Sequence, residues 1–571
     1  MNQTIPAIFF DRAEREADHD ALLVKRSEKF EPVTWKALAQ DVSRMVAVLK
    51  SLGVSPGDRV LHVSENRYEW IVTDLAIQTA LAIHVPVHAS LTGPQIIFQL
   101  VHSEARVVII STSTQADKLS ECSHSVPEST IFLSYDPCDQ QIGDRPLKLV
   151  SNLRERLDHI HDASTCQQAF AQLAPDSLAT ILYTSGTTGQ PKGVMLSHAN
   201  LVSNTYGAIE GVQLGTGEVR INLLPFSHIF ARTCDLYAWF AVGGILALAE
   251  SPETAVADCA MIRPTVMNAV PYFYDKLRQA LIALQLDTTP GSLRQLLGGN
   301  IQVCCSGGAA LPNHIFDFFH KQGVLLFEGY GLSETSPVIA VSSPAEHRRG
   351  SVGRPIPDVE VRVAEDGEFL TRGPHVMVGY YKNPEATKEA LQDGWFATGD
   401  LGYVDHDGFL YITGRKKELL VTAGGKNIAP TMLETLLSED PLIFQAMIIG
   451  NAKNYLTALI VPDLQALQTH LSTVDRSLNL DPAARGNDIF PTAGLYAFFE
   501  ERIAQRLKSV SKHEQVRRFT LLDRPFTVET GELTPKMSLR RATIEEHFAA
   551  EILAMYSKSS SGGVDFNLQA E

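Results

Sequence analysis

A short run of small and hydroxyl-bearing residues has the chemistry needed to bind the phosphates of a nucleotide. It reads Tyr183-Thr-Ser-Gly-Thr-Thr-Gly-Gln-Pro-Lys-Gly193. Its candidate binding residues are Thr184, Ser185, Gly186, Thr187, Thr188, Gly189 and Lys192. Hydroxyls, exposed N–H groups and a lysine suit a polyphosphate, and glycine lets the backbone approach it closely. A flexible polar turn would have the same composition, but the apolar strand predicted at 179–183 and the closing Pro-Lys-Gly favour phosphate binding.

The spacing around Lys192 does not fit the phosphate loop of kinases and GTPases. That loop needs a glycine, four residues and then Gly-Lys-Ser/Thr. Here Gln190 and Pro191 separate Gly189 from Lys192, and Gly193 follows the lysine. The run is therefore predicted to hold phosphates in a different way.

Two further segments place polar groups and glycines directly after predicted strands. Pro225-Phe-Ser-His-Ile-Phe-Ala-Arg232 follows a strand predicted at 220–224 and carries His228 among aromatic residues. A lone histidine in such a setting is usually a core residue. In Ser306-Gly-Gly-Ala-Ala-Leu-Pro312, Gly307 and Gly308 permit the close approach of a flat ligand, or they simply make a tight turn.

Later segments add a stacking platform, a metal ligand and several charges. Glu328-Gly-Tyr-Gly-Leu-Ser-Glu-Thr-Ser-Pro337 combines an aromatic face, a hydroxyl and a carboxylate, and carboxylate oxygen is a ligand that Mg²⁺ prefers. Gly394-Trp-Phe-Ala-Thr-Gly-Asp400 ends on an acid that could otherwise cap a helix. The basic run at 415–417 could be a solvated face, but it lies at a shift in composition.

These segments, in this order, resemble the signatures of the adenylate-forming superfamily, which includes acyl- and aryl-CoA synthetases, nonribosomal peptide adenylation domains and firefly luciferase. The resemblance extends from about residue 34 to 548. The versions around His228 and Tyr330 are most similar to long-chain fatty acyl-CoA synthetases. The resemblance implies an α/β fold with a large N-terminal lobe of layered α/β subdomains at 1–414, a small mobile α+β lobe at 415–556 and a flexible tail at 557–571.

The resemblance also implies a role for each matching residue. In the nucleotide site, Tyr330, beside Gly331, would stack on adenine, Thr335 would touch the α-phosphate, Glu334 would bind Mg²⁺, and Asp400 and Arg415 would hold the ribose. In the acyl site, His228 would lie beside the carboxylate, while Gly307 and Gly308 would line the adenine and acyl sites. Gly424 and Gly425 match a loop that swings in for thioester formation, and Lys417 matches the hinge between the lobes.

The implied activity is the ATP-dependent joining of a fatty, long-chain acid to CoA, with ATP, CoA and Mg²⁺ at the site. Two alternatives are a fatty acyl-AMP ligase that loads a carrier protein and a non-catalytic nucleotide-binding protein. The joint presence of Lys192, Glu334, Asp400 and Arg415 disfavours the second, and the Gly424-Gly425 loop mildly favours CoA over a carrier protein.

The C-terminal lysine of the family departs from its pattern here. That lysine bridges the attacking carboxylate and the phosphate, and an ungapped match places it at Ser538. The nearest lysine is Lys536, two positions earlier. Residues i and i+2 of an extended segment face the same side, about 6.6 Å apart, so we expect Lys536 to take the catalytic role. The alternatives are that adenylation is impaired, or that Lys536 is a solvated lysine before a helix. Tyr272 is a second departure, at a position where the long-chain branch usually carries arginine.

Bulk composition narrows the class of protein and its partners. A net charge of −16 argues against nucleic acid, and 44% hydrophobic residues with 20% charged residues are typical of a globular enzyme. Seven scattered cysteines without a Cys-x-x-Cys pair indicate a reducing, cytoplasmic location and no zinc site. No signal peptide or membrane span is expected, although a lipid substrate leaves peripheral membrane contact open. The sequence does not indicate an oligomeric state.

The pattern of apolar residues also predicts individual elements. Leu38, Val42, Met45 and Leu49 follow the helical period, so a helix is expected at 34–52 with Thr34 as its cap. A helix is expected at 68–82, strands at 58–63 and 106–110, a loop at 288–300 and one closing helix at 538–556.

Overall fold

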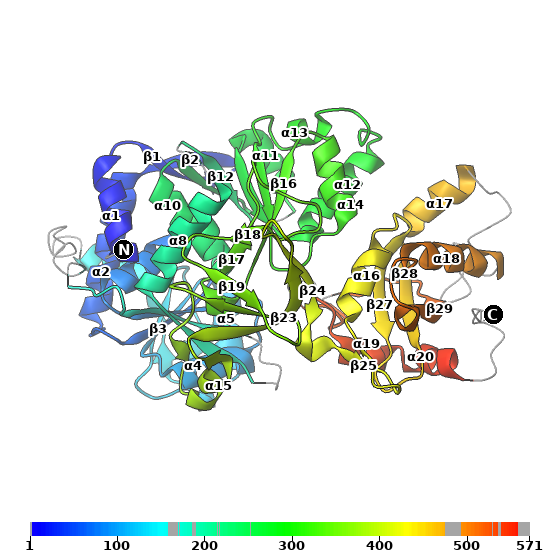
Figure 1. Ribbon diagram of the computed structural model, residues 1–571. Helices are drawn as coiled ribbons and strands as arrows, with labels where there is room; N and C mark the ends of the chain where they lie inside the picture. The colour runs from blue at the N-terminus through cyan, green and yellow to red at the C-terminus, as the bar shows by residue number, and fades with distance from the viewer. Residues whose placement is uncertain are drawn as a thin grey trace.

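The computed structural model describes the chain except for short gaps. The described residues are 3–157, 170, 172–184, 190–213, 215, 217–251, 253–473, 493–527, 529–534 and 538–557. Figure 1 shows a large lobe formed by the N-terminal part of the chain and a smaller lobe formed by the C-terminal part. This division agrees with the predicted fold class.

The first large sheet has nine strands and is parallel through its centre. In spatial order these are β18 (Arg354–Pro355), β17 (Val338–Val341), β16 (Leu325–Gly331), β15 (Val303–Ser306), β14 (Val266–Ala269), β12 (Val219–Asn222), β13 (Ile245–Leu248), β1 (Asp20–Arg26) and β2 (Lys29–Thr34). The strands from β16 to β1 run parallel, and the pairs β16–β17, β17–β18 and β1–β2 at the two sides of the sheet are antiparallel. The parallel strands therefore end at one common edge, where loops gather.

The second large sheet has eight strands. Their order is β21 (Gly379–Tyr380), β11 (Lys192–Ser197), β10 (Leu178–Thr184), β4 (Ile83–Val87), β3 (Arg59–Val63), β5 (Val107–Ile110), β6 (Ile131–Ser134) and β9 (Lys148–Leu149). Only the pairs β21–β11 and β11–β10 are antiparallel. The predicted phosphate loop thus joins two paired strands, β10 and β11.

A third sheet completes the large lobe. It contains β19 (Glu360–Val363), β20 (Glu368–Arg372), β23 (Trp395–Val404) and β22 (Leu391–Gln392), and β24 (Leu410–Arg415) pairs with β23. Figure 1 shows β23 and β24 extending toward the smaller lobe. The chain passes into that lobe immediately after β24.

Helices cover both faces of the two large sheets. Those nearest the main core are α1 (Ile5–Arg15), α2 (Trp35–Ser51), α3 (Tyr68–Thr79), α8 (His198–Val212), α9 (Ile229–Ala231), the π-helix η2 (Arg232–Tyr237) and α10 (Ala238–Val242). The outer faces carry α4 (Gly93–Ser103), α5 (Ser113–Ser120), α11 (Ala255–Ile262), α12 (Pro271–Ala283), α13 (Ser292–Leu296) and α14 (Asn313–Lys321). The large lobe also contains α6 (Val150–Leu157) and α15 (Pro384–Ala390).

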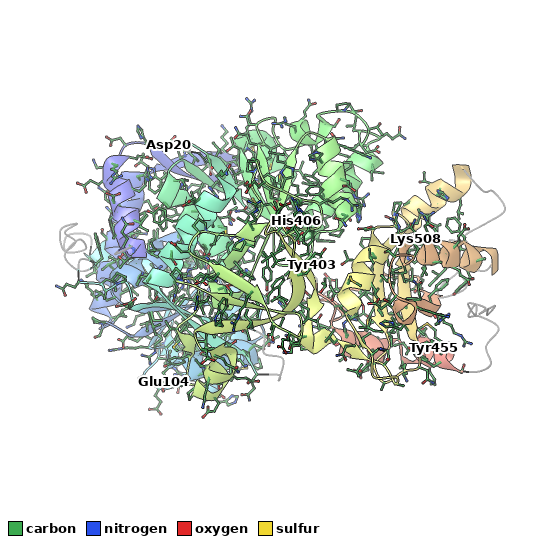
Figure 2. All side chains as sticks on the ribbon, viewed as in Figure 1. Asp20, Glu104, Tyr403, His406, Tyr455 and Lys508 are labelled. Carbon is green, nitrogen blue, oxygen red and sulfur yellow. The ribbon has the colours of Figure 1, made fainter. Side chains whose placement is uncertain are left out.

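The smaller lobe is an α+β unit with its own core. Its strands are β25 (Leu420–Val421), β26 (Asn427–Ile428), β27 (Ile443–Ile449), β28 (Leu456–Pro462) and β29 (Val516–Leu521). Its helices are α16 (Pro430–Ser438), α17 (Leu464–Thr473), α18 (Ala493–Arg506), α19 (Arg541–His547) and α20 (Ala549–Tyr556). Figure 2 shows side chains filling both lobes, with Tyr455 and Lys508 in the smaller one and Glu104 in the larger one.

Local sequence explains the predicted elements well. The helix expected at 34–52 is α2, and the Thr34 hydroxyl accepts a hydrogen bond from the N–H of Ala37 at 3.2 Å, as an N-cap does. The helix at 68–82 is α3, and the strands at 58–63 and 106–110 are β3 and β5. Among the described residues, none of the helices combines the length and apolar composition that crossing a membrane would take.

Two local predictions are wrong. The expected loop at 288–300 contains α13, whose Leu293 is fully buried, so tertiary burial stabilises a short helix between glycines. The expected single helix at 538–556 is two helices, α19 and α20, which meet at Phe548 with φ −110° and ψ 29°. Phe548 is buried against Phe526 at the break, and that packing requires the chain to turn.

Candidate active site

One cavity of about 1150 Å³ lies where the loops of the three large-lobe sheets meet. Most of the predicted site residues that the structure describes line it. These are Thr184, Lys192, His228, Gly307, Gly308, Tyr330, Gly331, Glu334 and Arg415. Part of its wall is polar and part is apolar, the latter formed by α8, η2 and the face of the first sheet. The cavity can therefore take a polar ligand and an apolar ligand side by side.

At the polar end of the cavity, Lys192 and Glu334 both contact the side chain of Tyr380. Register pairs Lys192 with Thr184, so the ends of the loop at 184–192 lie together, while Ser185, Gly186, Thr187, Thr188 and Gly189 lie outside the described residues. The Lys192 ammonium lies 4.8 Å from the centre of the Tyr380 ring. The Tyr380 hydroxyl donates to Glu334 Oε1 at 2.9 Å, and burial, followed by the Glu334 charge, raises the pKa of Tyr380. A cation and a carboxylate are thus held on one aromatic side chain.

Asp400 and Arg415 form a second polar cluster with Tyr330. They are register partners on β23 and β24, and Arg415 Nε lies 2.8 Å from Asp400 Oδ1. The Tyr330 hydroxyl donates to Asp400 Oδ2 at 2.7 Å. Burial raises the pKa of Asp400, and Arg415 opposes that shift. A carboxylate has about four acceptor positions, and these two contacts occupy two of them. Asp400 itself is 2% exposed, whereas its partners Tyr330 and Arg415 line the cavity.

The turn that carries Tyr330 is fixed by close backbone packing. A Cβ on Gly331 would lie 1.7 Å from the Pro337 carbonyl oxygen, so only glycine fits. The Thr335 hydroxyl accepts from the Leu332 N–H at 2.9 Å and lies 2.5 Å from the Pro337 carbonyl oxygen. Thr335 is fully buried, so in this structure its hydroxyl stabilises the turn from within.

His228 faces the cavity from the start of α9. Its Nδ1 accepts from the N–H of Phe230 at 3.2 Å, which holds the ring as an N-cap. Gly307 lies against the same segment, because a Cβ there would lie 3.1 Å from the Phe230 ring. The two segments that carry the predicted acyl residues, 225–232 and 306–312, therefore lie against each other.

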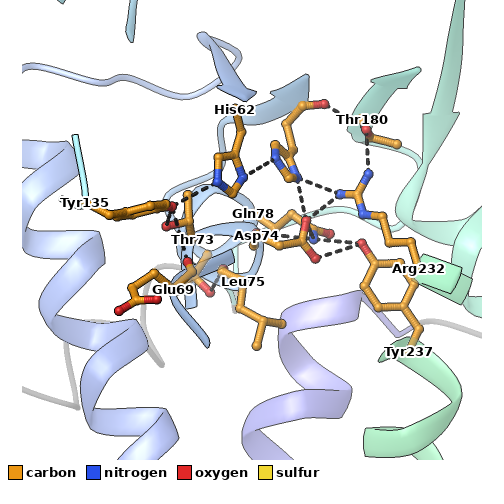
Figure 3. A network of polar contacts seen from close by, with 12 residues as sticks. His62, Glu69, Thr73, Asp74, Leu75, Gln78, Tyr135, Thr180, Arg232 and Tyr237 are labelled. Carbon is orange, nitrogen blue, oxygen red and sulfur yellow. Dashed lines mark hydrogen bonds and ion pairs between the residues drawn. The ribbon is translucent and has the colours of Figure 1, made fainter. Parts of the chain in front are cut away.

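A buried polar network anchors the segment that begins with His228 (Figure 3). Arg232, one helical turn later, contacts Asp74 of α3 at 2.5 Å and donates to the Thr180 hydroxyl of β10 at 2.8 Å. His84 Nδ1 lies 2.6 Å from the same carboxylate. Burial alone would raise the pKa of Asp74, but Arg232 and His84 hold it below its ordinary value. The network joins the segment that begins with His228 to the sheet that carries the predicted phosphate loop.

An ion pair between Lys416 and Glu368 connects the start of the smaller lobe to the larger one. Glu368 accepts from the Gly399 N–H at 2.8 Å and from the Lys416 ammonium at 2.9 Å. Lys417, the predicted hinge, lies in the 3₁₀ turn η4 (Lys416–Glu418) and lines the cavity. Burial, followed by the charge of Arg415, lowers the pKa of Lys417. The predicted hinge is thus directly beside the cluster of Asp400, Arg415 and Tyr330.

The remaining predicted residues lie away from the cavity or outside the described residues. Gly424 and Gly425 form the exposed turn between β25 and β26, closed by a hydrogen bond from Thr422 N–H to the Lys426 carbonyl at 3.0 Å. Lys536 lies outside the described residues, and the N–H of Ser538, two positions later, donates to the Thr534 hydroxyl at 3.1 Å. The roles of Lys536 and the two glycines stay predictions.

Several residues of the site were not singled out from the sequence. These are Tyr380, Asp74, Glu368, Lys416 and Arg220. Charged residues are rarely buried, so a charged residue within a predicted strand, such as Arg220, can be singled out from the sequence as a candidate. Tyr380 and Asp74 carry no local signal, because their partners are 46 and 158 positions away.

The family follows from comparison with known proteins. The family described as AMP-binding enzyme matches residues 9–381, and the AMP-binding enzyme C-terminal domain matches residues 417–560. The chain therefore belongs to the AMP-binding, adenylate-forming enzymes, and the family resemblance predicted from the motifs is confirmed.

Relatives and solved structures agree with this assignment. The chain is 36% identical over 567 residues to the Long-chain-fatty-acid--CoA ligase FadD15 of Mycobacterium tuberculosis, covering 92% of each chain. It is 26% identical to the Long-chain-fatty-acid--CoA ligase ACSBG2 of Xenopus laevis, covering 99% of this chain and 85% of that one. ATP-bound MatB from Rhodopseudomonas palustris superposes with a TM-score of 0.74 at 23% identity, covering 96% and 99% of the two chains. The last likeness shows the fold, and the predicted two-lobe α/β class is confirmed.

Proposed function

We propose that this protein uses ATP to activate a fatty acid and transfers the acyl group to CoA. The products are acyl-CoA, AMP and pyrophosphate. The observation that carries the proposal is the single cavity that joins a nucleotide-type polar end, with Lys192, Glu334 and Arg415, to an apolar end beside His228. The names of the two curated relatives, both fatty-acid–CoA ligases, support it.

In the first step, a carboxylate oxygen of the fatty acid forms a bond to the α-phosphorus of ATP and pyrophosphate leaves. Such phosphoryl chemistry depends chiefly on positioning and on charges aimed at the transferring group. Lys192, held over Tyr380, supplies one such charge next to the phosphate loop. His228 lies at the acyl end, where the attacking carboxylate would be held.

Glu334 would hold Mg²⁺ when the nucleotide is bound. Among the described residues, no three His, Cys, Asp or Glu side chains converge on one point, so the other ligands would be phosphate oxygens and water. This donor set fits Mg²⁺, which usually binds through one or two carboxylates and substrate phosphates. The ion would neutralise phosphate charge.

Nucleoside recognition is assigned to the second polar cluster. The two acceptor positions left on Asp400, together with the Arg415 guanidinium, would hold the ribose hydroxyls, and Tyr330 would stack on adenine. In the same proposal, the fully buried Thr335 supports the α-phosphate region through the turn it stabilises.

In the second step, the thiol sulfur of CoA forms a bond to the acyl carbon, the C–O bond of the anhydride breaks and AMP leaves. A rotation of the smaller lobe about Lys417 would bring the Gly424-Gly425 turn to the cavity between the two steps. Lys536 would serve the first step only. A cytoplasmic location, with contact to membranes where fatty acids partition, belongs to the same proposal.

The test is to assay the purified chain with ATP, Mg²⁺ and a fatty acid, with and without CoA. We expect pyrophosphate release with the acid, and acyl-CoA only when CoA is present. Acyl-AMP that accumulates and is not turned over by CoA would instead indicate a carrier-protein ligase. Absence of pyrophosphate release with every fatty acid would contradict the proposal.

A further inference from the structure

Arg220 crosses the space between the first sheet and the helices above it. It is the second residue of β12, and its side chain is 1% exposed. Nη1 donates to the carbonyl of Cys234 in η2 at 2.8 Å, and Nη2 lies 2.6 Å from Glu218 Oε2. The Arg220 side chain therefore bridges β12 and η2 within the layer that contains the cavity, and we call this bridge the bar.

The cavity follows one face of this sheet down to that bar. Side chains two residues apart on a strand share a face, so Val266 and Asn268 of β14 point the same way, as do Val303 and Cys305 of β15. Register pairs Arg220 with Val266 and Val266 with Val303. Val266, Asn268, Cys305 and Arg220 all line the cavity. Arg220 and its register partner Val266 are thus the residues of β12 and β14 nearest the amino ends of the strands that line the cavity.

The length of the apolar path can be estimated from the strands. Gly307, at the reaction end, follows the last residue of β15 and is four residues beyond Val303, which corresponds to about 13 Å at about 3.3 Å per residue. With carbon–carbon bonds of about 1.5 Å in a zigzag, a straight alkyl chain spans that path with on the order of ten carbons. A longer chain must bend inside the cavity or displace the bar.

We propose that Arg220, held by Glu218 and the Cys234 carbonyl, closes the acyl tunnel and sets the upper limit on the length of the fatty acid. The proposal rests on the function proposed above and makes Arg220 a specificity-determining residue. The bar is held at both sides, because one nitrogen is paired with a carboxylate and another is bonded to a helix backbone. The two charges offset each other, so the end of the tunnel bears no net charge toward the acyl chain.

The test compares kcat/KM for saturated acids of about eight to about twenty carbons. In the wild-type protein we expect a steep fall beyond one length, about tenfold or more for each methylene that no longer fits. Two double variants then separate length from charge: Glu218→Gln/Arg220→Ala and Glu218→Gln/Arg220→Met. Both remove the ion pair together, so neither leaves a buried charge without a partner.

Expected results differ between the two variants. Methionine keeps most of the length of arginine, so the limit should stay at the wild-type value. Alanine opens the end of the tunnel, and the limit should move to longer acids by roughly two to four carbons, the length of the groups removed. A limit that is the same in the alanine variant as in the wild type, or that moves equally in both variants, overturns the proposal.

A third variant leaves the ion pair intact. Val266→Leu adds one methylene at the level of Arg220 and should shift the limit to shorter acids by about one carbon. An unchanged limit in this variant, or a wild-type profile that is flat to about twenty carbons, shows that acyl chains do not reach the bar and overturns the proposal. Absence of pyrophosphate release with every acid in the wild-type protein would instead reject the underlying function, which distinguishes the two failures.

Discussion

The guanidinium of Arg232 contacts the carboxylate of Asp74 at 2.5 Å, and neither side chain is exposed to solvent. The two residues are 158 positions apart in the chain and tie η2 to α3 (Figure 3). Arg232 lies one turn beyond His228, so the position of the segment that carries His228 depends on this buried pair.

Arg232→Met should destabilise the protein strongly. Removing one partner leaves the Asp74 carboxylate buried without its cation, which typically costs about 3–5 kcal/mol. Urea unfolding at neutral pH measures the loss. The matched control is Arg372→Met, whose partner Glu360 is on the surface and whose loss should change stability little. Equal effects in the two variants would contradict the anchoring role of Asp74.

Lys192→Ala should slow acyl-AMP formation by about 10²-fold or more, the scale of losing one preorganised charge in an active site. Pyrophosphate release measures it. The control is Lys382→Ala, because that ammonium also lies over a tyrosine ring, Tyr381 at 5.2 Å, but pairs with Glu104 on the surface. If the control loses as much activity, the effect of Lys192 is structural and the phosphates bind elsewhere.

Asp400→Ala should raise the KM for ATP and reduce discrimination against 2′-deoxyATP. Each hydrogen bond from a ribose hydroxyl to the carboxylate is worth about 1.5–3 kcal/mol, so the loss should be larger for ATP. The measurement is kcat/KM for both nucleotides, with Asp317→Ala, which pairs with Arg349 on the surface, as control. An equal loss for both nucleotides would show that Asp400 does not read the ribose 2′-hydroxyl.

Lys417→Pro should affect the second half-reaction more than the first. Proline fixes φ near −65°, so it removes the torsional freedom that a hinge at this residue needs. Adenylation is followed by pyrophosphate release, and transfer is followed by supplying acyl-AMP and CoA. Lys417→Ala removes the side chain but keeps the torsion, so it should preserve the ratio of the two rates. Equal losses in the proline variant would indicate misfolding instead.

Protonation of His198 should lower stability as the pH falls. Burial, followed by the charge of Arg232, lowers the pKa of His198 to about 3, and its Nδ1 faces the N–H of Ile5 at 3.4 Å. The unfolded chain binds a proton below about pH 6.5, but the folded chain does not until about pH 3. The contribution of neutral His198 to the free energy of unfolding is therefore fully present above pH 6.5. It falls by about 1.4 kcal/mol per pH unit below that pH.

The prediction for His198 is checked by urea unfolding from neutral to mildly acidic pH. The difference in the free energy of unfolding between wild type and His198→Gln should change with that slope, in favour of the variant at low pH. His406→Gln is the control, since that side chain is 86% exposed. A difference that does not depend on pH would show that His198 titrates normally.

The sequence by itself determined the class of the protein and the identity of most of the candidate site. Phosphate, metal and ribose chemistry each require particular residue types at short spacings, and Lys192, Glu334, Asp400 and Arg415 stand in such local segments. Local periodicity likewise determined α2 and its cap at Thr34, because a helix depends on neighbours three and four residues apart. Their roles at the site remain predictions for the experiments above.

Only the tertiary structure decided which distant residues meet. The pairing of Arg232 with Asp74, the contact of Tyr380 with Glu334 and the bar formed by Arg220 join segments whose separation no local pattern encodes. The same reason explains the two wrong elements, because burial of Leu293 and Phe548 against other parts of the chain overrides local propensity. What a residue can do is fixed by its chemistry, but where it acts is fixed by packing between segments that are far apart in the chain.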